Sequence, residues 1–298
     1  MVLLVILSPR HGLTEQTENY SQANRRMKEG SKLVSIPLKF DQNLFSKAVR
    51  SFPLNSGDTS QKNTQRLIKG AVVPHHDLAD DLIAQIFQKI ALNQKEIKKV
   101  IIIGPNHPDA GIDEAISGYL SWNFLGTMVN TDQVSVDSLF ENNLVKINND
   151  VLAKEHSIFT IIPFVHHYFS EATVVPIILS SKHHIKKCEK LANGLKNLVD
   201  KNTIVIASVD FSHYLPSFIA PQKDIITKQA LEKFDYETIS KLDNDYLDSP
   251  PSIITLLKTM RNLTSNNMIM VSNTNSGILL HQEVQSSTSY FTYIFTQD

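Results

Sequence analysis

The feature that most constrains the fold of this chain is Val100–Ile103, a run of four consecutive β-branched residues. Such a run is typical of a strand that is buried on both faces in a parallel α/β sheet. Gly104 and Pro105 follow at once and end the strand, so Asn106 and His107 stand at its carboxyl end. In open α/β sheets this edge is where ligands bind. The run therefore predicts an α/β fold with a polar site at a strand end.

Two other segments show the same arrangement of an apolar strand followed by His or Asp. Residues 71–74 (Ala-Val-Val-Pro) lead into His75, and residues 203–208 lead to Asp210 and His213. Since the carboxyl ends of parallel strands meet at one edge of a sheet, the three segments together predict one polar site to which all of them contribute.

Residues 77–92 carry an amphipathic helical pattern between the first two of these strands. Leu82, Ile86 and Ile90 are spaced by four, and the acids of the first turn suit the helix dipole. Strand, helix and strand form one βαβ unit from about residue 70 to residue 104. We predict a single α/β domain with a mostly parallel central sheet and helices on both faces. Further strands are predicted at residues 115–119, 126–129, 173–179, 268–272 and 287–295, and helices at 132–145, 156–169, 183–200, 222–234 and 250–262.

The first 66 residues are predicted to form an N-terminal extension, and residues 67–298 the main domain. Residues 33–38 favour an edge strand, because an edge strand tolerates a proline such as Pro37, and a short helical piece follows. Residues 51–65 are rich in Ser, Asn, Asp, Gln and Thr, which is typical of a mobile loop.

The composition argues against nucleic acid and membranes as partners. With 29 basic and 30 acidic residues in 298, the chain has no bulk charge that would attract nucleic acid or anionic lipid. The apolar start, Met1–Leu7, is too short to cross a bilayer, which takes about 20 residues, and fits a terminal strand or an added remnant. Residues 8–30 have the polar character of a loop. The single cysteine, Cys188, excludes an internal disulfide and a multi-cysteine metal site, and fits a reducing, cytoplasmic location.

His75, His107 and the pair Asp210 and His213 are the candidates for chemistry at the strand ends. His75 either serves the site or caps the helix that begins near residue 77. His107 stands after a Gly-Pro turn, where a role as metal ligand or proton carrier explains it better than loop filling. Asp210 and His213 are three residues apart, so the carboxylate can orient the imidazole on a tight turn; a simple capping interaction is the alternative.

A further histidine, His156, follows Glu155 at the predicted start of an apolar helix. The helix dipole favours the neutral imidazole there, which suits a proton donor or acceptor or a ligand, while a plain N-terminal hydrogen bond is the alternative. We interpret His76 as a supporting or structural residue and Cys188 as a bystander. The remaining pairs, His166-His167 and His183-His184, are predicted at solvated helix ends.

Four motifs occur in a fixed order along the chain. They are Val-Val-Pro-His75-His, Ile-Ile-Gly-Pro-Asn-His107, Glu155-His156-Ser-Ile followed by Pro163-Phe, and Ala-Ser-Val-Asp210-Phe-Ser-His213. Each motif alone is weak, but together, over about residues 68–296, they resemble the MEMO family, whose prokaryotic members are called AmmeMemoRadiSam system protein B. That family is similar to the class III extradiol dioxygenases, which implies an α/β domain with non-haem iron at the strand ends.

The resemblance implies a role for each matching residue. His75 and His107 match the two metal-side histidines of the family. Asp210 and His213 match an Asp-Phe-x-His element, whose histidine corresponds to the acid–base residue of the dioxygenases. His156 matches the histidine of the Glu-His-Ser motif.

The third metal-side residue of the animal members is a cysteine, and this chain departs from that pattern. The matching stretch, residues 246–253, has no cysteine, and Asp248 is the nearest replacement. With His75 and His107 it would form a facial triad of two histidines and one carboxylate, which suits Fe(II), with Cu or Zn as other candidates. Alternatively, Asp or Ser before two prolines is a standard helix N-cap.

The residues and the resemblance together leave three candidate functions. The first is a non-haem iron oxidoreductase that acts on a small molecule with O₂, with His213, held by Asp210, as general base and His156 as proton donor. The second is a non-catalytic module whose vestigial site binds a peptide or another protein. The third is a metal-dependent hydrolase, since clusters of His and Asp also activate water.

Overall fold

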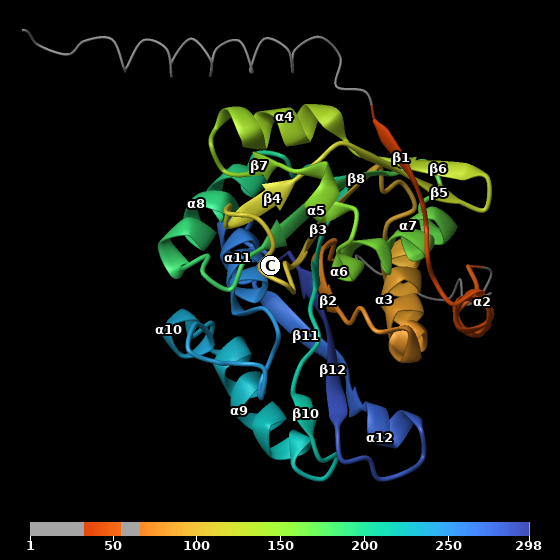
Figure 1. Cartoon of the computed structure of the whole chain (residues 1–298), viewed down its shortest axis with the longest axis vertical. Coiled ribbons are helices and arrows are strands. Elements are labelled where there is room, and N and C mark those ends of the chain that lie inside the picture. Colours follow the sequence, from red (N-terminus) through yellow and green to blue (C-terminus); the bar gives the residue numbers. More distant parts are fainter. Residues whose placement is uncertain (1–32, 55–65, 298) are drawn as a thin grey trace, which may run out of the picture. The chain divides into compact units, whose positions relative to one another are not determined.

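Strands and helices alternate along the chain, and they build a central sheet covered by helices (Figure 1). The computed structural model describes residues 33–54 and 66–297. The predicted terminal strand at 1–7, the loop at 8–30 and residues 55–65 of the predicted mobile loop lie outside them. The elements are β1 (Val34–Pro37), α2 (Gln42–Ser51), β2 (Ile68–Val73), the 3₁₀ helix η1 (Asp77–Ala79), α3 (Asp80–Asn93), β3 (Lys99–Pro105), β4 (Ala115–Ser117), β5 (Leu120–Phe124), β6 (Thr127–Asn130), α4 (Gln133–Glu141), β7 (Lys146–Ile147), α5 (Asn149–Leu152), α6 (His156–Phe159), α7 (Ile162–Tyr168), β8 (Thr173–Leu179), α8 (Ile185–Lys196), β9 (Thr203–Ser208), β10 (His213–Leu215), α9 (Ala220–Glu232), α10 (Tyr236–Ile239), α11 (Pro250–Asn262), β11 (Asn267–Asn275), α12 (Ser276–Leu279) and β12 (Ser287–Thr296).

Four parallel strands form the centre of the main sheet, in the order β2-β9-β3-β8. On one side β12 pairs with β2 in the antiparallel sense, and on the other β4 does so with β8. Within the described residues the full order is β10-β12-β2-β9-β3-β8-β4-β7, with β11 paired to the free side of β12. The predicted α/β fold with a parallel centre is confirmed, and the antiparallel pairs lie at its two sides.

The strand that anchors the prediction, β3, is buried on both faces. Val100 and Ile102 belong to a core cluster that includes Phe87 of α3 and Phe164 of α7. Successive side chains of a strand point to opposite faces, so Ile101 meets the other helical layer. In that layer α11 lies over β3 and β9, and α8 packs on α11 (Figure 1). Helices therefore cover both faces of the sheet, as predicted.

The predicted helix at residues 156–169 is two shorter helices, α6 and α7. Pro163 is the second residue of α7, where its missing N–H would be unpaired in any case. The same proline would interrupt a continuous helix, because it cannot donate to a carbonyl one turn earlier. The break lets α6 present its first residue, His156, at the sheet edge independently of the direction of α7.

Residues 34–54 pack against the remainder of the described chain. The predicted edge strand is β1, which pairs in parallel with β5 in a second sheet of order β1-β5-β6. The predicted short helix is α2, which Asp41 caps and which buries Phe45 against Phe164, with ring centroids 5.1 Å apart. The role of residues 1–66 as an extension stays a prediction for the part outside the described residues.

No helix in the described part of the chain combines the length and the apolar character needed to cross a bilayer.

A buried acid at the start of α3 predicts a pH-dependent stability. Asp80 is only 6% exposed. Its burial, together with the charges of Asp77 and Asp41, raises the pKa of its carboxyl group to about 8. Between the unfolded pKa near 4 and this value the folded state binds more protons than the unfolded state, so the free energy of unfolding falls as pH rises. We expect the free energy of unfolding of Asp80→Asn, relative to that of wild type, to increase by about 1–3 kcal/mol from pH 5 to pH 9.

Urea denaturation of both proteins at the two pH values measures this difference. Asp81→Asn removes a charge from the same turn at a more exposed position and is the control for the loss of a carboxylate there. A stability difference for Asp80→Asn that is the same at pH 5 and pH 9 would contradict the prediction.

Candidate metal centre

Three strand ends and one helix start bring the candidate residues to one edge of the central sheet. His75 follows β2 after a proline, His107 follows β3, and Asp210 follows β9. Because β2, β9 and β3 are parallel neighbours, their carboxyl ends share this edge. Asp248 stands just before α11, the helix that covers the same strands.

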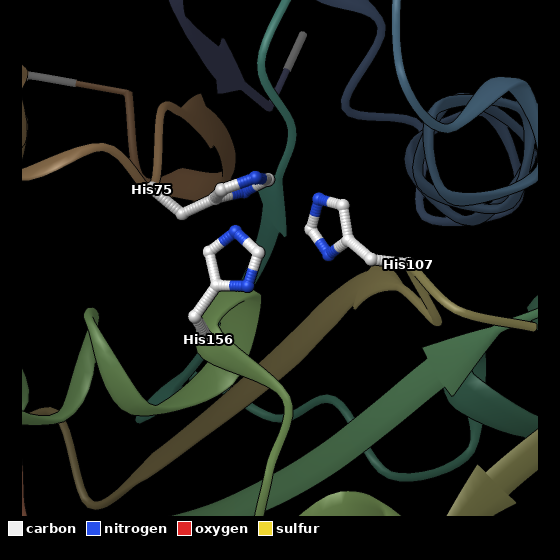
Figure 2. Close-up of side chains that lie close together, drawn as sticks. All are labelled: His75, His107 and His156. Carbon is white, nitrogen blue, oxygen red and sulfur yellow. The ribbon is translucent and has the colours of Figure 1, made fainter. Parts of the chain in front are cut away.

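Figure 2 shows the imidazoles of His75, His107 and His156 gathered around one space, each from a different element. The ring centroid of His75 lies 5.1 Å from those of His107 and His156, and the last two rings stack at 4.1 Å. One nitrogen of each ring lies within 4.8 Å of a nitrogen of both others. Imidazole nitrogens suit zinc, copper, iron and nickel, so the three histidines could hold a metal ion.

The carboxylate of Asp248 reaches both strand-end histidines. Its Oδ2 lies 3.2 Å from His75 Nε2 and 3.6 Å from His107 Nε2, and it accepts a hydrogen bond from the backbone N–H of Asp210 at 3.3 Å. The N-cap of α11 is the next residue, Ser249, whose Oγ accepts from the backbone N–H of Ser252. Of the two roles open to Asp248 from the sequence, the structure gives the cap to Ser249 and leaves the carboxylate facing the histidines.

Partners on the far side fix the orientation of both rings. The Oγ of Ser208 lies 3.3 Å from His75 Nδ1, and Glu155 Oε1 lies 2.7 Å from His107 Nδ1. Both Nδ1 atoms are thus occupied, and both Nε2 atoms point at Asp248. Histidines that bind a metal are held in this way, with the second ring nitrogen donated to a polar group.

The electrostatics of the cluster are strongly coupled. Burial alone would lower the pKa of His75, but the carboxylates of Asp210 and Asp248 outweigh it and raise the pKa. Burial also opposes the charge on His107, yet hydrogen bonds to Asp248 and Glu155 raise its pKa to about 10. Burial would raise the pKa of Asp248, but the charge of His75 and the hydrogen bond from His107 hold it below its usual range. Both rings therefore favour the protonated form more than a free imidazole does, and the carboxylate of Asp248 lies between them.

Glu155 is the principal residue that sequence reasoning did not assign to the site. Its Oε1 accepts from the backbone N–H of Ser157 as the N-cap of α6, and its Oε2 accepts from the backbone N–H of His107. Burial opposes the charge of Glu155, but the hydrogen bond and the charge of His107 lower its pKa. The signal was present in the Glu-His-Ser motif, in which an acid directly precedes a predicted helix start.

Glu155 yields a testable prediction. Glu155→Gln keeps the size of the side chain but loses the charge that orients His107, so the affinity for a divalent metal is expected to fall about 10- to 100-fold. Competition between the protein and a chelating dye for Co²⁺ measures the change. Glu171→Gln, at an exposed carboxylate on the surface, is the matched control and should leave the affinity unaltered. Equal losses from the two variants would contradict the prediction.

A close approach of two elements supports the same position. The Oγ of Ser157 donates to the carbonyl of Pro105 at 3.1 Å. A Cβ on Gly104 would collide with that hydroxyl, so only glycine lets the start of α6 lie against the end of β3. The Gly-Pro turn that ends β3 in the sequence thus also makes room for the helix that carries His156.

Asp210 and His213 do not form the pair that their spacing predicts. Asp210 Oδ1 accepts from the backbone N–H of His75 at 3.0 Å, and its Oδ2 lies 3.9 Å from His75 Nε2. His213 begins β10, and its Nδ1 is buried without a hydrogen-bond partner among the described residues. Residues 213–215 form β10 and pair with β12, and no hydrogen bond joins His213 to Asp210 in the described chain. Burial lowers the pKa of His213, so its ring is neutral.

His156 occupies the first position of α6, as predicted, with a side chain 47% exposed. Burial of part of the ring and the charges of His75 and His107 lower its pKa to about 4. The neutral ring is therefore the stable form at neutral pH, as the position at a helix start predicts.

Other histidines fall away from this cluster. His76, not His75, caps the following turn, with its Nδ1 accepting from the backbone N–H of Leu78 at 3.3 Å. His167 is exposed at the end of α7, as predicted. His183 is a correction: it is only 4% exposed, although it lies in the short segment that leads into α8. The sequence pair His183-His184 does not reveal that one ring turns inward. Cys188 is buried, and its Sγ contacts the carbonyl of His183.

A cavity of about 240 Å³ lies over the centre. His107, His213 and Asp248 line it, together with the exposed Tyr214. Although Asp210 does not orient His213, the cavity places His213 where a molecule beside His107 and Asp248 would meet it.

A family model described as Memo-like protein matches residues 40–294 of this chain. A MEMO1 family protein of Sulfolobus acidocaldarius is 28% identical over 214 residues, which cover 70% of this chain and 72% of that protein. A MEMO1 family protein of Pyrobaculum arsenaticum is 28% identical over 221 residues, covering 70% and 76%. One of Thermoplasma volcanium is 30% identical over 178 residues, covering 58% and 65%.

Among solved structures, an uncharacterized protein from Escherichia coli K12 aligns with a TM-score of 0.49 and 14% sequence identity. The alignment covers 76% of this chain and 99% of that chain.

Proposed function

This chain belongs to the Memo-like protein family, and we propose that it binds one Fe(II) ion through His75, His107 and Asp248 as an extradiol-dioxygenase-type oxidoreductase. The observation that carries the proposal is the position of Asp248 Oδ2, 3.2 Å and 3.6 Å from the Nε2 atoms of the two histidines. Two histidines and one carboxylate are the ligand set of non-haem Fe(II) enzymes that keep positions open for substrate and oxygen.

The spacing of these atoms fits a common metal ion. Two ligand atoms that each lie about 2.1 Å from a metal, at angles of 90° to 110°, are separated by about 3.0–3.4 Å. The two distances from Asp248 Oδ2 lie at or just above this range, so small shifts would suffice. Asp248 Oδ1 is buried without a hydrogen-bond partner in the described chain, and a cation would satisfy it.

When bound, the metal would supply Lewis acidity and open positions for O₂ and an oxygen-bearing aromatic substrate. His213 is neutral and lines the same cavity as His107 and Asp248, so it takes the proton of a substrate hydroxyl as general base. His156 is also neutral and stacks on His107, so its ring N–H donates a hydrogen bond to the developing charge, while transfer of a full proton would require the imidazolium form. Asp210 acts on His75, whose backbone N–H it holds, and not on His213.

The proposed function also includes the class of substrate, the partners and the cellular location. The substrate is a small molecule, neither nucleic acid nor membrane is a partner, and the single cysteine fits the reducing conditions of the cytoplasm.

A non-catalytic module that binds a peptide or protein is the second candidate. The observation that favours it is the charge balance: His75 and His107 favour the protonated form beside Asp248, so the cluster is satisfied electrostatically without a metal. In that case the cavity would recognise its partner through hydrogen bonds, and Asp248 would be the residue that replaces the metal-side cysteine of the animal members.

The test combines metal content with oxygen consumption. Protein purified without oxygen and supplied with iron should hold about one iron per chain by elemental analysis and should consume O₂ with a member of a catechol panel. If the protein takes up no transition metal, the proposed oxidoreductase function is wrong and the non-catalytic binding module becomes the better explanation. Turnover that continues without O₂, with addition of water to the product, would instead establish a metal-dependent hydrolase.

A further inference from the structure

A second, larger cavity of about 950 Å³ adjoins the metal centre. It lies between the segment that leads into α8, the loop after α10 and the start of α11. Ser181, Asn244 and Asp248 line both this cavity and the 240 Å³ cavity over the centre. Asp248 therefore stands where the two meet. The volume lies within the range of small-molecule sites, about 300–1,000 Å³.

One wall of the larger cavity is a helix N-terminus that lacks a cap. The N-cap of α8 is His184, and its side chain accepts no capping hydrogen bond. Among the described residues no acceptor faces the backbone N–H groups of His184, Ile185 and Lys186. Lys182 and Lys186 flank them and form no ion pair with a described residue. Free N–H groups at a helix start, together with the helix dipole, attract anions.

His183 provides an independent indication of a missing ligand at the same wall. The residue lines the larger cavity and also a cavity of about 340 Å³ on the side of Glu114, is only 4% exposed, and neither ring nitrogen has a hydrogen-bond partner in the described chain. Its Nδ1 lies 4.0 Å from Glu114 Oε2, beyond hydrogen-bond range. Buried polar groups are nearly always paired, so an unpaired imidazole beside three free N–H groups points to an absent partner.

The side chains on the other walls of the larger cavity indicate the chemical character of the rest of the ligand. Apolar side chains, among them Ile185, Leu247 and Ile254, line the body of the cavity. Three acids of the described chain lie opposite α8, and two of them have partners there: Asp243 accepts from the backbone N–H of Asp245, and Asp245 pairs with Lys223 at 3.2 Å, while Glu237 lines the same wall. A ligand with an apolar body and an anionic end matches this division.

We infer that the larger cavity binds the substrate, and that the substrate carries a carboxylate or phosphate, which the start of α8 holds while its reactive end lies beside Asp248. This inference rests on the proposed function for the reactive end, but the anion site itself is independent of the metal. The free N–H groups and the two lysines bind the oxyanion, and the apolar wall packs on the body between it and the centre.

The test measures binding to metal-free protein by calorimetry with two matched probes, 4-phenylbutyrate and the neutral 4-phenylbutanamide. We expect the acid to bind at least about tenfold more tightly than the amide. Lys182→Gln with Lys186→Gln should remove this preference. Lys190→Gln with Lys196→Gln removes the same charge from the same helix away from this cavity and should keep it.

His184→Asp tests the backbone N–H groups directly. An aspartate at the N-cap occupies these donors with its own carboxylate, so the variant should lose the preference for the acid while its Tm rises by about 1–3 °C. The rise in Tm shows that the variant is folded. The inference is overturned if wild type binds the acid and the amide with equal affinity, or if it binds neither measurably. It is also overturned if Lys190→Gln with Lys196→Gln loses the preference for the acid. Retention of the preference in His75→Ala with His107→Ala would separate the anion site from the metal proposal, which can fail on its own.

Discussion

Asp248→Asn is expected to lower the affinity of the protein for a divalent metal by more than about 100-fold. Loss of an outer partner of a metal ligand costs about 10- to 100-fold, and loss of a ligand costs more. The asparagine keeps the size of the side chain but removes the charge that lies between His75 and His107. Replacing both histidines by alanine should abolish binding. Titration of the metal-free proteins with Co²⁺, followed by competition with a chelator, measures both effects.

His156→Ala is the variant that distinguishes the two possible ligand sets. If His75, His107 and Asp248 hold the metal, His156→Ala should change the affinity by less than about tenfold. If the three histidines hold it, His156→Ala should have the large effect and Asp248→Asn the small one. Circular dichroism of each variant is the control for folding, because the double alanine variant leaves the buried carboxylate of Asp248 without its partners.

His213→Gln is expected to reduce kcat by about 10²- to 10⁴-fold on any substrate that the oxygen-uptake screen identifies, while metal content stays that of wild type. Positioned acid–base catalysis contributes this much to a rate. Glutamine retains hydrogen bonding and approximate size but cannot take a proton. Because His213 makes no side-chain hydrogen bond within the described chain, its replacement should cost little stability.

His167→Gln removes an exposed imidazole at the end of α7 and serves as the matched control. Steady-state oxygen consumption of the three proteins at saturating substrate gives the comparison. A His213→Gln variant with the kcat of wild type would exclude His213 as the general base and would turn attention to His156.

The central strands could be predicted closely because their signal is local. The runs at residues 173–179 and 203–208 coincide with β8 and β9, since a strand buried on both faces must be apolar throughout. The helix at 250–262 coincides with α11 because serine followed by two prolines marks a helix start. β5 was not predicted: Leu120–Phe124 contains polar Ser and Asn, and it is a strand through its pairing with β1 and β6.

The candidate site also has features that the local sequence predicts and features that it does not. The convergence of His75, His107 and Asp210 follows from parallel strands that share an edge, and the sequence is sufficient to predict it. The partner of each side chain depends on directions within a few ångströms. Asp210 turns to the backbone of His75 in place of His213, and Glu155 holds His107 from a distance of 48 residues along the chain. Neither contact has a spacing that a single sequence would reveal.

The placement of Asp248 has a consequence for when the centre can form during synthesis. The two histidines belong to the first βαβ unit, whereas Asp248 lies at the start of α11, more than a hundred residues later. A ribosome adds about 5–20 residues per second, so the nascent chain carries the first two ligands for several seconds before the third emerges. A metal ion held by all three would thus be captured late, and its binding would report that α11 has docked on the sheet.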